Sequence, residues 1–303
     1  MFKEALLYVA QNQQLRDFVV HNQTARNISH RFVAGEVLNE AVQATRVLNS
    51  KSIQATLNLL GENVSDEKQA RAATQEYMTL LDAIKQAEID ANISLKLTAL
   101  GLDISHSLCE ENIHAILEHA QSSSIFVCID MEDSSYTEQT VDITLRMHEQ
   151  FKHVGTVIQA YLYRSMEDIK QLIARGVRVR LVKGAYKESK AVAFQHKSEV
   201  DGSYVKLMMP LLAHGNFPAI ATHDEAIIDA ACRRVSDYGI GKSTFEFQML
   251  YGVRRDLQEK LIHWGYNVRV YVPYGSQWYP YLIRRMAERP ANLMFVMSNV
   301  LRG

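Results

Sequence analysis

Eight short apolar or β-branched segments alternate with helix-like stretches over most of the chain, and this alternation limits the folds open to it. The segments are residues 53–60, 93–100, 125–131, 154–162, 177–183, 217–223, 243–249 and 268–272. Stretches with the periodicity of amphipathic helices separate them, and several are followed by a glycine. Eight βα units over about 240 residues match a (β/α)8 TIM barrel of the α/β class in number and length. An open doubly wound sheet is the alternative, but it rarely needs eight units this regular.

The first 50 residues carry helical periodicity without a predicted strand. None of the five prolines precedes Pro210, and no Ser/Pro-rich linker interrupts the chain. We therefore predict a single domain over residues 1–303, in which a helical arm (1–50) precedes the barrel and terminal helices (53–303).

Composition narrows the classes of function. The net charge of −1 and the pI near 6.8 give no electrostatic reason to expect nucleic acid. The three cysteines are odd in number and widely spaced, which suits a reducing compartment, and no apolar run reaches the length of a membrane span. Without a signal-peptide pattern at the start, a cytoplasmic protein is expected. The eleven histidines show no ligand spacing, so no metal site is expected.

The period of two along each predicted strand separates apolar from polar side chains. The apolar sets should pack under the helices, so the polar sets should line the barrel lumen toward its C-terminal mouth, where barrel active sites lie. The residues expected around this cavity are Lys96, Asp130, Gln159, Arg180, Glu246 and Tyr271. A purely structural network of internal ion pairs is the alternative. A polar site is favoured because burying that many charges for structure alone is costly.

A short helix with marked ends follows the last strand, between Ser276 and Pro290. Arg284 and Arg285 share one of its faces with Tyr281 and Glu288. Paired guanidinium groups match the geometry of a small carboxylate, although a solvated face with salt bridges is the alternative. Because the helix directly follows strand eight, we expect it to lie over the barrel mouth.

Two other functions fit the same polar mouth. Lys96 has the position of a Schiff-base lysine, as in a class I aldolase. The non-enzymatic alternative is a barrel that binds a small amino or carboxylic acid without turnover. The apolar run 293–297 is expected to pack against the barrel, with contact to a membrane surface or a partner as the alternative.

Four motifs in order along the chain resemble those of proline dehydrogenases. They are RLVKGAY at 180–186, ATH at 221–223, FEFQML at 245–250 and Tyr281-x-x-Arg284-Arg285. The likeness runs from about residue 53 to 298 and is greatest to the bacterial monofunctional form. It implies a distorted (βα)8 barrel that holds FAD and oxidises L-proline to Δ1-pyrroline-5-carboxylate. It also implies electron transfer from the reduced flavin to a membrane quinone, with possible peripheral contact at the inner face of the cell membrane.

The resemblance also implies roles for single residues. Lys96, Arg284 and Arg285 would bind the proline carboxylate. The pocket around the ring would be shaped by Leu250, Tyr271 and Tyr281. Asp130 resembles an aspartate near the substrate, in the hydrogen-bond network of Tyr271, and Arg180 would stabilise the negative charge of the reduced flavin. The positions that match FAD contacts are Met131, Gln159, Arg180, Lys183, Gly184, Ala185, Thr222 and His223.

Two features of the sequence qualify this match. Asp224 stands where family members often carry an amide, and Tyr274 follows Val272-Pro273. Neither touches the expected carboxylate clamp. Glu62, after the first strand, is expected to pair with the arginines of the final helix as a gate.

Overall fold

A closed barrel of eight parallel strands forms the centre of the protein. The computed structural model describes residues 29–61 and 64–288, and of residues 284–288 only the backbone. The strands are β1 (Gln54–Leu59), β2 (Ala91–Leu95), β3 (Val127–Ile129), β4 (Val154–Gln159), β5 (Arg178–Val182), β6 (Ala219–Ala221), β7 (Glu246–Leu250) and β8 (Asn267–Tyr274). They pair in sequence order, and β1 closes the barrel on β8. The predicted (β/α)8 fold is confirmed.

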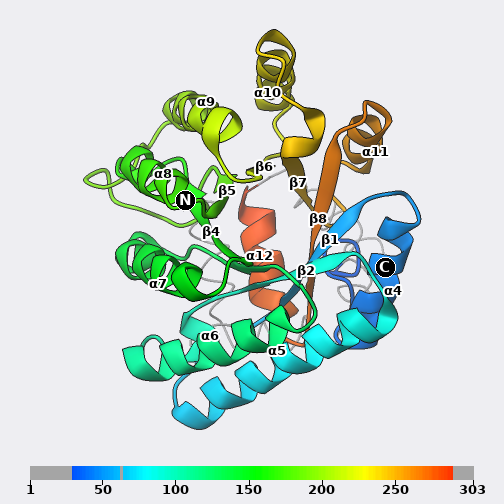
Figure 1. Cartoon of the computed structure of the whole chain (residues 1–303), viewed down its shortest axis with the longest axis vertical. Helices are drawn as coiled ribbons and strands as arrows, with labels where there is room; N and C mark the ends of the chain where they lie inside the picture. Colours follow the sequence, from blue (N-terminus) through cyan, green and yellow to red (C-terminus); the bar gives the residue numbers. More distant parts are fainter. Residues whose placement is uncertain (1–28, 62–63, 289–303) are drawn as a thin grey trace, which may run out of the picture.

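Seven helices follow the first seven strands and surround the barrel (Figure 1). They are α5 (Glu67–Ala87), α6 (His106–Gln121), α7 (Thr137–Gln150), α8 (Ser165–Ala174), α9 (Lys197–His214), α10 (Glu225–Asp237) and α11 (Arg255–His263). Side-chain caps mark several starts: Asp66, Ser105 and Asp224 accept hydrogen bonds from the first turns of α5, α6 and α10. Short 3-10 turns lie at Thr98–Leu100, Ser134–Tyr136 and Lys242–Thr244.

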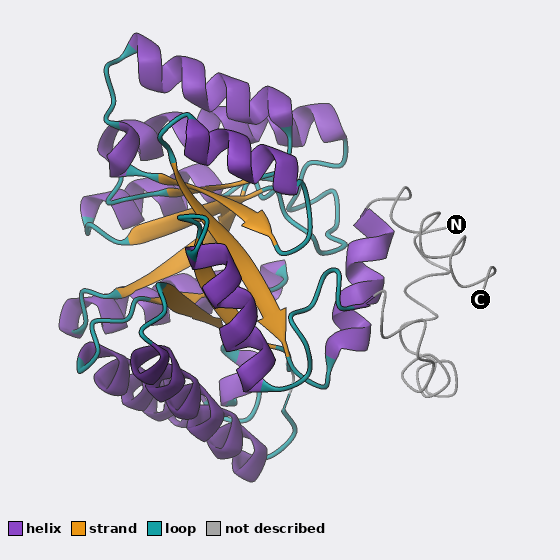
Figure 2. Ribbon diagram, turned by 90° about the vertical axis from the view of Figure 1, so that its right-hand side faces the viewer, coloured by secondary structure: helices purple, strands orange, loops and turns teal. Residues whose placement is uncertain are grey.

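Two helices depart from a regular barrel. Helix α4 (Leu38–Asn49), from the predicted arm, packs on β1 and β8 and lies in the outer ring between α11 and α5 (Figure 1). Helix α12 (Trp278–Glu288), which follows β8, instead lies across the end of the barrel toward which the strands point (Figure 2). An N-terminal helix thus completes the ring, and the helix after β8 covers the mouth. None of the helices in the described ranges is long and apolar enough to cross a membrane.

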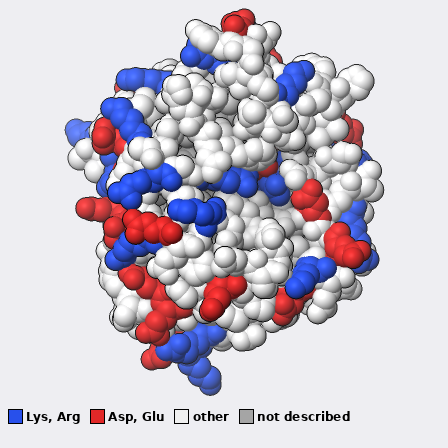
Figure 3. All heavy atoms as spheres, viewed as in Figure 1, with Lys and Arg blue, Asp and Glu red and all other residues white. Residues whose placement is uncertain are grey.

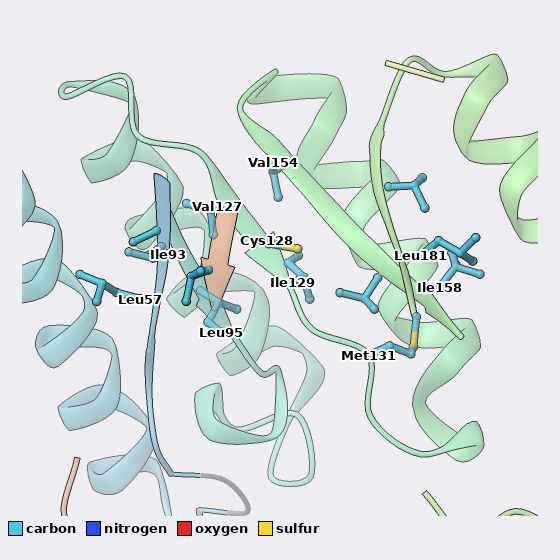
Figure 4. Packing of buried hydrophobic residues seen from close by; sticks show 14 of the residues in the cluster. Leu57, Ile93, Leu95, Val127, Cys128, Ile129, Met131, Val154, Ile158 and Leu181 are labelled. Carbon is cyan, nitrogen blue, oxygen red and sulfur yellow. The ribbon is translucent and has the colours of Figure 1, made fainter. Parts of the chain in front are cut away.

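Apolar side chains on the outer face of the strands form one large core with the surrounding helices. Leu57, Ile93, Val127 and Ile158 belong to this core and are almost fully buried (Figure 4). The opposite face of the strands carries the polar side chains, as the period of two predicts. This division places charged groups inside a closed barrel, where each needs a partner.

A layer of charges fills the N-terminal half of the barrel. Glu246, fully buried at the start of β7, accepts hydrogen bonds from Arg269 Nε at 2.9 Å and from Gln248 Nε2 at 2.6 Å. The Arg178 guanidinium lies 4.1 Å from the centroid of the Phe126 ring and 4.5 Å from that of Phe217. The expected position of Glu246 at the mouth is therefore wrong: as the first residue of β7, it lies at the opposite end in a structural network.

The surface at this opposite end has a mixed charge. Figure 3 shows the face viewed in Figure 1, where lysine and arginine side chains cross the middle and acidic side chains lie among them and toward the rim. Much of the face carries neither charge. On this face no broad region of a single sign is present, in keeping with the net charge of −1.

The Arg269–Glu246 pair is expected to be important for stability. Replacing Arg269 by Met leaves the Glu246 carboxylate buried beside weaker partners, so the free energy of unfolding should fall by about 3–5 kcal/mol. Lys51→Met is the control, because Lys51 pairs with Glu259 at 2.7 Å on the surface, where such a pair contributes about 0–1 kcal/mol. Urea unfolding followed by circular dichroism measures both. Equal losses in the two variants would contradict the assignment of Glu246 to a structural layer.

Candidate active site

Asp130 is the centre of a hydrogen-bonded cluster inside the C-terminal half of the barrel. Its Oδ1 accepts hydrogen bonds from Arg180 Nη1 at 2.7 Å and from Ser94 Oγ at 2.6 Å. Its Oδ2 accepts a hydrogen bond from the Tyr271 hydroxyl at 2.7 Å. Arg180 Nη1 also donates to Ser94 Oγ at 3.2 Å. Side chains from β2, β5 and β8 and from the residue after β3 thus converge on one carboxylate.

The electrostatics of this cluster follow from burial. Burial raises the pKa of Tyr271 well above its usual value of 10, and the Asp130 carboxylate raises it further. Tyr271 therefore stays a neutral hydrogen-bond donor at physiological pH. Burial also raises the pKa of the nearby Cys128 thiol, to about 11, so this thiol stays protonated. The Arg180 guanidinium lies 5.3 Å from the centroid of the Tyr271 ring. This cation–π contact helps to hold Arg180 beside the Asp130 carboxylate.

One position of the Arg180 guanidinium is not used by the protein. Its Nε is buried and finds no hydrogen-bond partner within the described ranges. An unpaired buried donor costs about 1–3 kcal/mol, so native structures seldom leave one without an acceptor. Arg180 therefore keeps a buried donor that none of the described residues satisfies.

The loops after β2 and β3 and the last residue of β4 are tied to each other beside the cluster. The carboxylate of Glu132 accepts hydrogen bonds from Thr98 N at 3.2 Å and Thr98 Oγ1 at 2.6 Å. Gln159 Nε2 donates to the Glu132 carbonyl oxygen at 2.8 Å. Lys96 directly follows β2, and Met131 is buried between Asp130 and Glu132. Three of the predicted site residues thus lie close together: Lys96 and Met131 on the loops after β2 and β3, and Gln159 at the end of β4.

A second charged cluster lies after β5 and β6. Lys183 Nζ donates to Asp201 Oδ1 at 2.5 Å and to Asp224 Oδ2 at 2.7 Å, and Lys197 binds the same two carboxylates. The hydrogen bond from Lys183 is the main reason that the pKa of Asp224 falls to about 2. Asp224 therefore stays ionised and holds Lys183 in one place. The cluster fixes β5 against the first turns of α9 and α10.

Thr222 and His223 connect this cluster to β7. The Leu250 backbone N–H donates to His223 Nε2 at 2.8 Å, so this nitrogen acts as an acceptor. Thr222 Oγ1 accepts from Asp224 N at 3.1 Å. The first of these hydrogen bonds directly joins His223, a predicted FAD contact, to Leu250, a predicted substrate contact. Leu250 is the last residue of β7.

Gly184 allows the chain to turn after β5. Its φ of +112° is unfavourable for other residues, and a Cβ atom there would lie 2.5 Å from the Tyr161 ring. Ala185 follows it in the same connection. The glycine of the KGAY motif is thus required by backbone conformation and by the neighbouring ring.

The expected carboxylate clamp is described only in part. Tyr281 is buried in α12, and the backbones of Arg284 and Arg285 continue the same helix over the mouth. Their side chains, Glu62 and the apolar run 293–297 lie outside the described residues. The arginine clamp and the gate thus stay predictions.

Sequence reasoning missed three residues of these clusters. Ser94 lies two residues before Lys96 and therefore points to the same face. This alternation was the signal in the sequence that could have identified Ser94. Asp201 and Lys197 lie on α9, and they contact Lys183 only through the packing of that helix on the barrel. No group of three potential ligands for a metal ion occurs in the part of the chain that the structure describes.

Comparison with known proteins identifies the family. The sequence model described as proline dehydrogenase matches residues 41–298. Proline dehydrogenase 1 of Bacillus subtilis subsp. natto is 44% identical over 302 residues, which cover 100% of both chains. The proline dehydrogenase of Deinococcus radiodurans is 40% identical over 308 residues, which cover 100% of this chain and 99% of that protein.

A solved structure agrees with the fold. The crystal structure of proline utilization A from Bdellovibrio bacteriovorus, inactivated by N-propargylglycine, aligns with a TM-score of 0.82 at 25% identity. The alignment covers 93% of this chain and 38% of that much longer one. The motifs, the barrel and the full-length relatives thus agree, and the chain belongs to the proline dehydrogenase family.

Proposed function

We propose that this enzyme oxidises L-proline to Δ1-pyrroline-5-carboxylate with FAD as its cofactor and passes the electrons to a quinone. The observation that carries the proposal is the buried cluster of Asp130, Arg180 and Tyr271 at the mouth of a barrel of this family. Family membership also argues against a Schiff-base aldolase built on Lys96 and against a barrel without turnover.

The chemistry of the side chains fits a flavin. The buried Arg180 Nε has no acceptor among the described residues, and the Lys183 ammonium is held beside the loops after β5 and β6. Both cations suit a cofactor that carries phosphates and becomes negative on reduction. The residues that would hold FAD are Met131, Gln159, Arg180, Lys183, Gly184, Ala185, Thr222 and His223.

When bound, the flavin supplies the acceptor for a hydride from C5 of proline. The protein positions the substrate: Lys96, Arg284 and Arg285 bind its carboxylate, and Leu250, Tyr271 and Tyr281 enclose its ring. Asp130 holds Arg180 and Tyr271 in place by accepting one hydrogen bond from each, and it accepts a third from Ser94. Since Tyr271 remains protonated, it acts as a donor and not as a base. Catalysis in this proposal is positioning and electrostatic stabilisation.

The electron acceptor determines where the enzyme works. A quinone resides in a membrane, so a cytoplasmic protein that reduces it must touch the inner face of the cell membrane at least transiently. The apolar run 293–297 has the composition for such contact.

The visible spectrum tests the central proposal. The purified protein should show a flavin spectrum that bleaches when L-proline is added without oxygen. Arg284→Met should need at least about tenfold more proline, because it loses a charge-assisted hydrogen bond to the carboxylate. Arg175→Met, which breaks only a surface pair with Glu149, is the matched control. A flavin spectrum that is indifferent to proline would overturn the substrate and retain the cofactor.

Asp130 and Ser94 should differ in importance. Asp130→Ala removes the acceptor shared by Arg180 and Tyr271, so kcat/KM for proline should fall by about a hundredfold or more. Ser94→Ala leaves the direct Arg180–Asp130 contact of 2.7 Å, so its loss should stay below about tenfold. Steady-state kinetics at equal flavin content measures both effects. Similar losses would show that the serine is as important as the carboxylate, against this assignment.

Lys183 and Lys197 provide a matched test of the cofactor site. Both bind Asp201 and Asp224, but Lys197 is mostly exposed. Lys183→Met should raise the dissociation constant of FAD by about tenfold or more, and Lys197→Met by less than about threefold. Titration of the apoprotein with FAD, followed by flavin fluorescence, gives both constants. Equal constants in the two variants contradict a contact between Lys183 and the cofactor.

A further inference from the structure

Residues 29–36, which we call the strap, cross the C-terminal end of the barrel beside α12. The Ala34 N–H donates to the Pro273 carbonyl oxygen at 2.8 Å, and the Gly275 N–H donates to the Gly35 carbonyl oxygen at 3.1 Å. Trp278 Nε1 donates to Glu36 Oε1 at 3.1 Å. The strap is therefore fastened to the end of β8 and to the first turn of α12.

The buried face of α12 packs on the strap. Phe32 and Val33 form a hydrophobic cluster with Leu60 and α12, separate from the main core of the barrel. The α12 residues of this cluster are Trp278, Tyr279, Tyr281, Leu282 and Ile283. Val253, in the loop between β7 and α11, packs against the cluster from outside. The position of α12 thus depends on where the strap lies.

Gly252 is the point where the loop after β7 touches the strap. A Cβ atom at Gly252 would lie 1.7 Å from the Arg31 carbonyl oxygen and 2.9 Å from its carbonyl carbon. Real Cβ atoms keep at least 3.0 Å from such atoms, so the loop and the strap would have to move apart by more than an ångström. The contacting atom is backbone, which cannot rotate away as a flexible side chain can. Any residue other than glycine here forces the loop and the strap apart.

The same loop borders the proposed substrate pocket. Gly252 lies two residues after Leu250, and the Tyr251 N–H donates to the Tyr271 carbonyl oxygen at 3.0 Å. This hydrogen bond ties the loop to β8 on the side of the barrel. A clash at Gly252 is transmitted to the strap and, through the shared cluster, to α12.

We propose that Gly252 is a positioning residue for substrate binding. Its missing side chain lets the strap approach the barrel, the strap sets the place of α12, and α12 carries Arg284 and Arg285. The inference rests on the proposed function, in which these arginines bind the proline carboxylate. A displacement of about 1 Å at such a clamp is enough to reduce binding strongly.

Gly265 provides a matched control. It has a φ of +80° against +73° for Gly252, but a Cβ atom at Gly265 meets nothing within 4 Å. Gly252→Ala and Gly265→Ala therefore share the backbone strain of alanine in the left-handed region. Only Gly252→Ala adds a clash with the strap. Any difference between the variants reports the contact with Arg31.

The kinetic test separates substrate binding from general damage. In Gly252→Ala the KM for proline should rise by about tenfold or more, while kcat and flavin content stay within about threefold of the wild type. Gly265→Ala should keep the wild-type KM even if it melts at a lower temperature. Equal KM values in the two variants overturn the inference.

The two tryptophans provide a readout that does not depend on turnover. Trp278 is 1% exposed in the cluster, whereas Trp264 is 39% exposed. Both variants are made in a Trp264→Phe background, so that only Trp278 emits. In Gly252→Ala the emission maximum of Trp278 should shift to the red, and iodide should quench it more strongly. In Gly265→Ala neither property should change. An unchanged emission in both variants contradicts a displacement of α12.

A second variant, Phe32→Ala, tests the role of the strap without a clash at Gly252. If Gly252→Ala does not fold, Phe32→Ala loosens the strap from the cluster without a clash and should raise KM in the same way; an unchanged KM then overturns the proposal. If wild-type protein is not reduced by proline, the proposed function fails. The Trp278 emission still decides whether Gly252 positions α12.

Discussion

A charge enclosed in a barrel of parallel strands must find its partner inside that barrel, and this requirement shapes the whole interior. The closed hydrogen-bonding of the sheet leaves the lumen side chains only each other, the strand carbonyl groups and whatever binds at the mouth. Glu246 and Arg269 satisfy one another near the N-terminal end, and Asp130 and Arg180 do so near the other end. Among the described residues, Arg269 and Gln248 both bind Glu246 in the N-terminal layer, while Arg180 in the other layer keeps a buried Nε without an acceptor. This difference distinguishes the structural layer around Glu246 from the candidate site around Asp130.

The number and order of the strands could be predicted because each strand is marked locally by apolar side chains and β-branched residues. Their lengths were less accurate. The apolar run 125–131 predicts a longer strand than Val127–Ile129, because Ile125 and Met131 are also buried in the core although they lie outside the strand. The place of α4 in the outer ring could not be predicted, since it depends on contacts with both β1 and β8. Amphipathic periodicity shows that a helix has a buried face but not which surface it covers.

The same distinction between local and distant information explains the candidate site. The period of two correctly places Asp130, Arg180 and Tyr271 on one face, and the structure joins them by hydrogen bonds. It also places Glu246 on that face, but the period carries no information about depth along the barrel axis. Lys183 could be selected from its motif, whereas its partners Asp201 and Asp224 come from two different helix starts. The contact between Gly252 and Arg31 likewise joins segments that are more than 200 residues apart and leaves no local pattern.

The seam between β1 and β8 has a consequence for synthesis on the ribosome. Arg269 donates to the carbonyl oxygen of Ala55, 214 residues earlier, so the barrel cannot close until nearly all of the described chain has emerged. During that time β1 presents an unpaired edge, and such edges invite pairing with other chains. Helix α4, made just before β1, packs on β1 and on β8 in the closed barrel. The N-terminal helix is therefore in place to shield the waiting strand, and contacts this distant in sequence favour slow closure.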